Sequence, residues 1–349
     1  MIAVQIVNLI MVLIPAGSLV AWTVAASRHY EGRPLLNHEP RRLVPWGFVD
    51  LILLIAALIA VQLVFMGSAR ALLGISFTER LSDMSPRYQA GVMTLFSVAT
   101  FVAWLIGMEW MRWRHDASWH DLGWQRDKAQ EDAVVGLVAY LMLITPVFAI
   151  QFILTRWMET KHPLIELLRE NPDPWFFVFS GFAAVIIAPI VEEYFFRVFL
   201  QGWLENVVVV TRAKEPVPRL AESLWRGTAT RQFHLTAVDL SEQSEDDVHD
   251  LVPVDNPSEE IAVGSQGVPS LDDLQPGRTW FPIVVSAALF AMAHVSHGPD
   301  PIPLFFLALG LGYIYQRTHR VLPCIVIHML VNGVSMFLLW VSVNQPTSG

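Results

Sequence analysis

Long apolar runs alternate along this chain with short stretches of charged and turn-forming residues. Most of the runs are long enough to cross a hydrocarbon layer of about 30 Å. A backbone in lipid must satisfy its own hydrogen bonds, so each run is expected to be a helix. The predicted helices cover residues 1–27, 46–67, 90–111, 132–155, 175–204, 280–296, 301–317 and 321–343.

This pattern predicts an all-α fold, namely a polytopic membrane bundle of about eight transmembrane helices with a polar, largely disordered insert. Composition agrees, because 54% of the residues are hydrophobic and 16% are charged, against about 25% charged in typical soluble proteins. The predicted division is an N-terminal helical part at 1–174, a second helical part at 175–343 and a tail at 344–349.

The insert at 205–278 interrupts the second helical part and holds most of the net charge. Residues 201–278 contain 14 acidic and 6 basic side chains, which gives −8 of the total charge of −9. The stretch 239–275 has 11 acidic residues and no Lys or Arg, a composition typical of disordered segments and of interaction tails. It is a candidate to bind a partner. No basic patch interleaved with aromatics occurs, so a nucleic-acid partner is not expected.

Charge between the apolar runs predicts an orientation. The first and third loops hold slightly more Lys and Arg than the second and fourth. By the positive-inside rule, the odd-numbered loops are expected in the cytoplasm and both termini outside.

Ionisable side chains inside the apolar runs are costly in lipid, so each requires a partner or access to water. Glu192, Glu193 and Arg197 lie within the fifth run. Glu193 and Arg197 are one helical turn apart and can form an ion pair, which is a structural role. Glu192 lies about 100° around the helix, which leaves its carboxylate free for another partner.

Two later helices carry further polar groups. His294 lies near the end of the sixth run, four residues after Phe290, and the last run holds His328 and Asn332 on one face. A single such residue is usually an interhelical hydrogen-bonding group. Three separate helices with costly groups could supply one another's partners, so we expect a shared intramembrane polar site.

These residues resemble the motifs of the CPBP family, the CAAX-protease and bacteriocin-processing type of intramembrane endopeptidase. The resemblance rests on three ordered motifs in residues 175–343: Glu192-Glu193 with Arg197, Phe290 with His294, and His328 with Asn332. The polar insert departs from the short connection usual between the first two motifs. The resemblance implies an integral multi-pass protein, in the cytoplasmic or plasma membrane of a prokaryote, that hydrolyses a membrane-associated or prenylated peptide or protein.

The resemblance also implies roles for individual side chains. Glu192, with His294, would activate a water molecule, and His328 and Asn332 would stabilise the oxyanion. Glu193, Arg197 and Phe290 would support them. No cofactor is expected, and such roles suit a low-dielectric pocket with fixed donors.

Three alternatives remain open from the residues. His294, His328 and Glu192 could instead hold zinc with an open position for water, although Asn332 is a poor zinc ligand. Cys324 and His328, one turn apart, could form a Cys–His dyad, although a buried cysteine is more often a small hydrophobe. The polar cluster could also serve a non-catalytic membrane scaffold, an immunity-type protein or a transporter.

Overall fold

The computed structural model describes residues 2–39, 43–73, 85–158, 174–212, 222, 224–227, 279–295 and 298–344, and the rest of the predicted insert lies outside them. Within these ranges the regular structure is helical and no strand occurs. The N-terminal helices are α1 (Ile2–Tyr30), α2 (Phe48–Leu73), α3 (Pro86–His115), the short η2 (Arg126–Lys128) and α4 (Ala129–Leu154). The C-terminal ones are α6 (Pro174–Phe182), η3 (Ala183–Ile187), α7 (Ala188–Glu193), η4 (Tyr194–Gln201), α8 (Gly202–Arg212), α11 (Phe281–Met292), α12 (Pro301–Thr318) and α13 (Leu322–Asn344).

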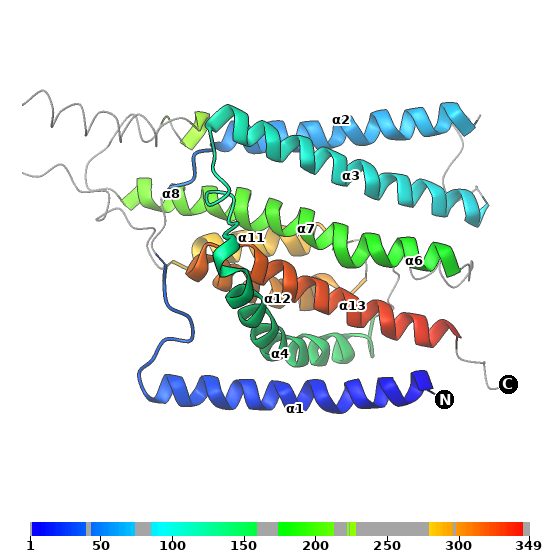
Figure 1. Ribbon diagram of the computed structural model, residues 1–349, viewed down its shortest axis with the longest axis vertical. Coiled ribbons are helices and arrows are strands. Elements are labelled where there is room, and N and C mark those ends of the chain that lie inside the picture. Colours follow the sequence, from blue (N-terminus) through cyan, green and yellow to red (C-terminus); the bar gives the residue numbers. More distant parts are fainter. Residues whose placement is uncertain are drawn as a thin grey trace, which may run out of the picture.

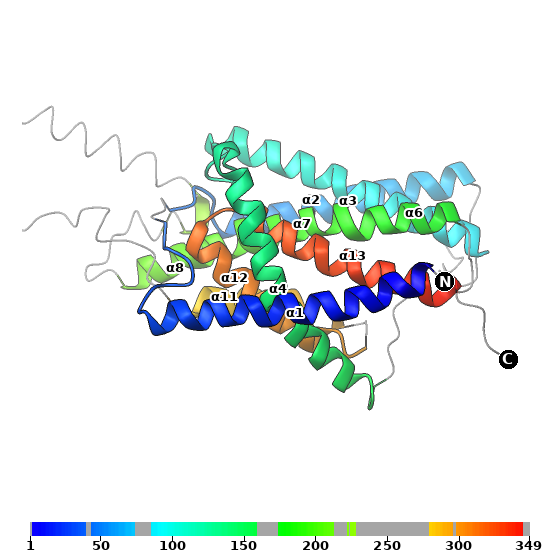
Figure 2. The same ribbon diagram turned by 60° about the horizontal axis from the view of Figure 1, so that its bottom comes forward.

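The helices form a bundle in which most axes run in roughly the same direction (Figure 1). Helix α4 is the exception, because it crosses obliquely between α1 and the remaining helices (Figure 2). The helices α6, η3, α7, η4 and α8 follow one another without a break and make one long rod through the middle of the bundle. The ends of α1, α3, α8 and α12 gather at the left of Figure 1, opposite the two chain termini.

Six of the helical segments in the described ranges are long and apolar enough to cross a membrane. They correspond to six of the eight predicted spans, so the protein is an integral membrane protein with the predicted all-α fold. The other two spans are also helices, but α11 is shorter, at 12 residues, and α12 ends in the polar residues Gln316, Arg317 and Thr318.

Helix α11 is shorter than its predicted span. The apolar run predicted a helix over 280–296, whereas α11 begins at Phe281 and ends at Met292. Its 12 residues rise only about 18 Å, which is too short for a layer of about 30 Å. The chain therefore turns back within the bundle, and α12 returns alongside α11.

A buried arginine joins three distant segments at the left end of the bundle. The Arg320 guanidinium, 1% exposed, donates to carboxylates of Asp132 and Glu131 on α4 and of Glu39 in the first loop. Burial by itself would lower the pKa of Arg320, but the hydrogen bond to Glu39 and the charge of Asp132 hold that pKa above its ordinary value. Arg320 therefore remains charged and fixes the turn from α12 into α13.

The central rod extends past residue 204, where the insert was predicted to begin, and continues to Arg212. Asn206 explains part of this extension, because its side chain bonds both the N–H and the carbonyl of Val44 in the first loop. The indole of Trp203 donates to the carbonyl of Leu224, which holds the described part of the insert against the bundle.

Candidate active site

The predicted polar residues of the first motif lie in the middle of the central rod. Two stretches of this rod, η3 and η4, have π-helical geometry, and α7 lies between them. A π-helical turn widens the helix and is often found at functional sites. Glu192 and Glu193 close α7, immediately before η4.

Pro189 leaves one carbonyl of η3 without its helical donor, because proline has no N–H. The N–H of Ala188 donates to the carbonyl of Ala183 in the π-helical pattern. In the same pattern the carbonyl of Ala184 would accept from residue 189, where proline has no N–H. The side-chain amide of Asn332 on α13 donates to Ala184 at 2.8 Å instead. Asn332 thus ties α13 to the rod about two turns before Glu192, and its amide carries a second N–H.

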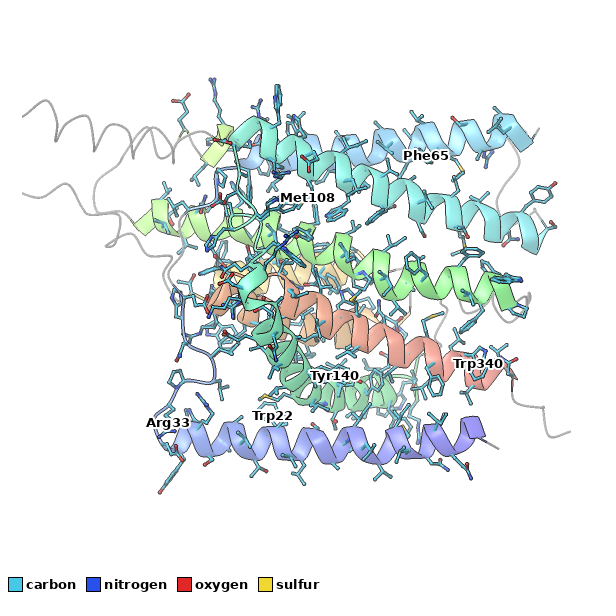
Figure 3. All side chains as sticks on the ribbon, in the orientation of Figure 1. Trp22, Arg33, Phe65, Met108, Tyr140 and Trp340 are labelled. Atoms are coloured by element: carbon cyan, nitrogen blue, oxygen red, sulfur yellow. The ribbon has the colours of Figure 1, made fainter. Side chains whose placement is uncertain are left out.

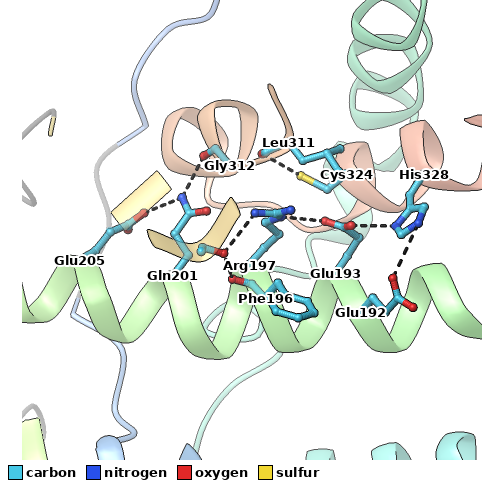
Figure 4. A network of polar contacts seen from close by, with 11 residues as sticks. Glu192, Glu193, Phe196, Arg197, Gln201, Glu205, Leu311, Gly312, Cys324 and His328 are labelled. Carbon is cyan, nitrogen blue, oxygen red and sulfur yellow. Dashed lines mark hydrogen bonds and ion pairs between the residues drawn. The ribbon is translucent and has the colours of Figure 1, made fainter. Parts of the chain in front are cut away.

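Glu193 is held between two donors in a fully buried position. Arg197 Nε lies 3.0 Å from Glu193 Oε2, and both side chains are 0% exposed. His328 Nδ1 lies 2.8 Å from Glu193 Oε1 (Figure 4). The ion pair predicted for Glu193 and Arg197 is therefore present, and the same carboxylate also fixes the ring of His328.

Glu192 faces the opposite edge of that imidazole and a second one. Its Oε2 atom lies 3.8 Å from His328 Nε2 and 4.0 Å from His294 Nε2. That oxygen is buried and has no hydrogen-bond partner among the described residues. The Glu192 and His294 side chains are 28% and 20% exposed, so the cluster opens to its surroundings at this point. Three predicted residues, from α7, the turn after α11 and α13, thus meet around one carboxylate oxygen.

The partners of the two imidazoles define which ring nitrogen donates. His294 Nδ1 lies 2.8 Å from the carbonyl oxygen of Phe290, which can only accept, so Nδ1 carries the proton. The same reasoning applies to His328, whose Nδ1 faces the Glu193 carboxylate already paired with Arg197. In the neutral form, both Nε2 atoms therefore present lone pairs toward Glu192.

Phe290 separates and orients the two imidazoles. It is fully buried, and its ring centroid lies 4.9 Å from that of His294 and 5.7 Å from that of His328. The Arg197 guanidinium lies over the same ring at 5.6 Å. Phe290, predicted as a supporting residue, thus packs against the catalytic candidates of two helices.

Two supporting groups were not found from the sequence. Ser286 on α11 accepts from Arg197 Nη1 at 3.2 Å and donates to the carbonyl of Phe196 at 2.8 Å. A lone serine in an apolar helix does not by itself indicate a supporting role at a site. Gln201 continues the row begun by Glu193 and Arg197, since the three recur every four residues, a spacing that was available before the structure.

Gln201 requires close approach of another helix. Its amide donates to the carbonyl of Gly312 on α12 at 2.9 Å and to Glu205 at 3.2 Å. A Cβ atom on Gly312 would lie 2.9 Å from Gln201 Oε1 and from Ile283 Cγ2. Glycine at 312 therefore allows α12 to approach both the rod and α11.

The sequence also left open a Cys–His dyad and a zinc site. The Cys324 thiol is fully buried and points to the carbonyl of Leu311 at 3.4 Å. Among the described residues, no group of three or more His, Cys, Asp and Glu is arranged to hold a metal ion.

Fold and site together define a multi-pass helical membrane protein with a carboxylate and two imidazoles converging inside the bundle. Residues 174–334 match the family model described as Type II CAAX prenyl endopeptidase Rce1-like. This segment, a little under half of the chain, is thus an Rce1-like domain of the CPBP group and holds every predicted site residue. Searches of curated proteins and of solved structures gave no match.

Proposed function

We propose that the protein is an intramembrane endopeptidase of the CAAX-protease type. The Rce1-like domain supports this reaction class. One observation carries the assignment of the site: a buried, unpartnered oxygen of Glu192 lies at 3.8 and 4.0 Å from two imidazole nitrogens. These separations exceed a direct hydrogen bond and suit a water molecule between the groups.

In the proposed mechanism, Glu192 and His294 act together on that water. The water donates toward Glu192 Oε2 and toward the lone pair of His294 Nε2, and one of them takes its proton as the oxygen attacks the peptide carbonyl. The same proton then passes to the leaving amine, so that hydrolysis gives two peptide products. A base within hydrogen-bond reach of water contributes about 10²- to 10⁴-fold to such a reaction.

His328 and Asn332 are the proposed oxyanion donors. His328 can donate from Nε2 when its ring is protonated at both nitrogens, while Glu193 continues to accept from Nδ1. Asn332 can donate through its second N–H, because the first is bonded to Ala184. Fixed donors in a low-dielectric site stabilise developing charge more than they would in water.

We propose that the reaction uses no metal. His294, His328 and Glu192 are ligand types that zinc accepts, but as arranged they do not form a metal-binding group among the described residues. Metal analysis of active, dialysed protein tests this point. Stoichiometric zinc whose removal abolishes cleavage and whose return restores it would replace the glutamate mechanism.

The experiment that tests the function is Glu192→Gln with a membrane-embedded or prenylated peptide as substrate. We expect cleavage to be lost while the protein still inserts and elutes as wild type, because Gln keeps the size but cannot take a proton. Glu222→Gln, on an exposed ion pair with Arg226, is the matched control. Full turnover by the Glu192 variant would remove Glu192 from catalysis.

A non-catalytic scaffold, immunity-type protein or transporter predicts another result. In that case neither wild type nor variant cleaves any peptide, and Glu192→Gln changes only stability or partner binding.

We further propose the cytoplasmic or plasma membrane of a prokaryote as the location of the protein, and a partner protein for the acidic stretch 239–275. Membrane fractionation and crosslinking in cells would check these two assignments.

A further inference from the structure

A polar pocket lies at the left end of the bundle, among residues that the proposed reaction does not use. It has a volume of about 670 Å³ and lies between the loop that follows α1 and the end of α12. Arg33 marks its position in Figure 3. The lining residues are His29, Gly32, Arg33, Pro34, Asn37, His38 and Arg317.

The lining is cationic. Two arginines and two histidines contribute to it, and no acidic side chain does. Two carboxylates lie on the same loop: Glu39 bonds Arg320, and Glu31 forms an exposed ion pair with the lining residue Arg33 at 3.3 Å, which a bound phosphate would replace. Planar guanidinium groups bind phosphate in a bidentate manner, so the pocket suits a phosphate-bearing anion.

The backbone around the pocket is fixed before any ligand binds. The N–H groups of Gly32 and Arg33 cap two carbonyls in the last turn of α1, those of His29 and Arg28. The loop is then fastened to α12, because the N–H of Glu39 donates to the carbonyl of Arg317 at 2.8 Å. Capping also occupies the carbonyl oxygens that would otherwise repel an anion at this helix end.

Arg317 is held in place by aromatic side chains. Its guanidinium lies 5.3 Å from the centroid of the Tyr313 ring, which itself stacks on Trp280 at 6.1 Å. Such support reduces the conformational entropy that the arginine loses when it binds a ligand.

The height of the pocket in the membrane matches a lipid head group. The membrane-crossing part of α1 ends at Tyr30, where the pocket begins. Leu19, Val20 and Val24, on the preceding turns of α1, are exposed apolar residues against which acyl chains can lie. Arg112, Arg126 and Lys128 lie at the same end of the bundle, as expected for the cytoplasmic side, where anionic lipids are concentrated.

We infer that this pocket binds the phosphate of an anionic ligand through Arg33 and Arg317, and that a phospholipid head group is the ligand that best fits its position. Inorganic phosphate offers the same chemistry without acyl chains. The two sources are distinguished by affinity, since chains alongside α1 strengthen binding of a lipid alone.

The test is a binding titration of the full-length protein in neutral detergent. The probes are a short-chain phosphatidylglycerol, phosphatidylcholine with the same chains, and inorganic phosphate. We expect saturable binding of phosphatidylglycerol, with affinity falling about tenfold or more for each of Arg33→Gln and Arg317→Gln. Arg126→Gln, which removes an exposed charge from the same end outside the pocket, should bind as wild type.

Each outcome bears on the inference. Equal affinity of wild type and both pocket variants, or equal loss in Arg126→Gln, would overturn it, as would no saturable binding of any phosphate. Arginine-dependent binding of phosphate as tight as that of phosphatidylglycerol supports the pocket and identifies a soluble source. The Arg33 side chain is 69% exposed, so Arg33→Glu should leave the packing intact. Loss of binding in this variant therefore cannot be attributed to misfolding.

Discussion

At the scale of single residues, two adjacent glutamates have opposite surroundings. Glu193 is fully buried with donors on both oxygens, whereas Glu192 is 28% exposed and keeps one oxygen without a partner. Their separation around the helix, about 100°, was readable from the sequence once a helix was assumed. The same reading paired Arg197 with Glu193 and left Glu192 for other partners.

Replacing Glu193 tests whether it positions His328. In Glu193→Gln, the amide N–H₂ would face Arg197 or His328, both of which are donors, so the ring loses its fixed orientation. We expect kcat to fall about 10- to 100-fold with KM little changed. Separate measurement of kcat and KM on protein that is verified as folded checks this. An unchanged kcat would mean that Glu193 serves stability alone.

The contacts that the sequence could not supply are those in which a side chain bonds a backbone carbonyl, including that of the predicted residue Asn332. Ser286 bonds the carbonyl of Phe196, and Asn332 bonds that of Ala184. Which carbonyl is available depends on the π-helical stretches, and no side-chain pattern indicates these. The motif residues Glu192, His294 and His328 could be predicted to converge because each is costly in lipid on its own.

At the scale of helices, the π-helical turn and Pro189 form one unit with Asn332. Proline removes a donor, the wider turn shifts the pattern by one residue, and a neighbouring helix supplies the missing hydrogen bond. Irregular helices in lipid are tolerated where adjacent helices satisfy the released backbone groups.

A double-mutant cycle tests this unit. Asn332→Leu should destabilise the folded protein by about 1–3 kcal/mol, because the Ala184 carbonyl is left without a donor. In the background Pro189→Ala, which restores an N–H, the same change should cost less, with a coupling of about 0.5 kcal/mol or more. Reversible unfolding in mixed micelles measures both values, with Ser335→Ala on α13 as the control. Additive effects would contradict the assignment.

Helix α11 shows why the length of one element could not be predicted. Its apolar run extends to residue 296, yet the helix ends at Met292 and His294 lies in the following turn. Local side-chain contacts accompany this end: the His294 ring folds back onto the Phe290 carbonyl and against the Phe290 ring. The sequence therefore predicted the existence of the helix and its start better than its end.

At the scale of the whole molecule, basic side chains define one end. Arg28, Arg33, Arg112, Arg126 and Arg317 belong to segments at the left of Figure 1. The loop charges in the sequence predicted that these segments share one side of the membrane. The bundle places these segments together, and their cytoplasmic orientation stays a prediction.

Cysteine labelling checks the orientation. In a Cys324→Ala background, Asp127→Cys should be protected from a membrane-impermeant maleimide in intact cells, and Ser85→Cys at the opposite end should react. Both native side chains are exposed, so accessibility reports the side of the membrane. Reversed labelling would place the basic end outside. Permeabilised cells, in which both positions should react, provide the control.

The protein class and the helical architecture were thus predictable from hydropathy and from the free-energy cost of polar side chains in lipid, because lipid restricts the backbone to helices and closed barrels. The crossing of α4 and the approach of α12 to the rod at Gly312 were not, since they depend on shapes of side chains that meet only in the fold.

The short α11 also sets a distance. Its 12 residues place His294 about 18 Å below the level at which the helix begins. An extended polypeptide covers about 3.3–3.6 Å per residue, so, under the proposed function, roughly five or six substrate residues would span the distance between the start of α11 and the site. A substrate would therefore be cut a fixed number of residues from its point of entry. Shortening it by a few residues would shift the cleavage position or abolish cleavage.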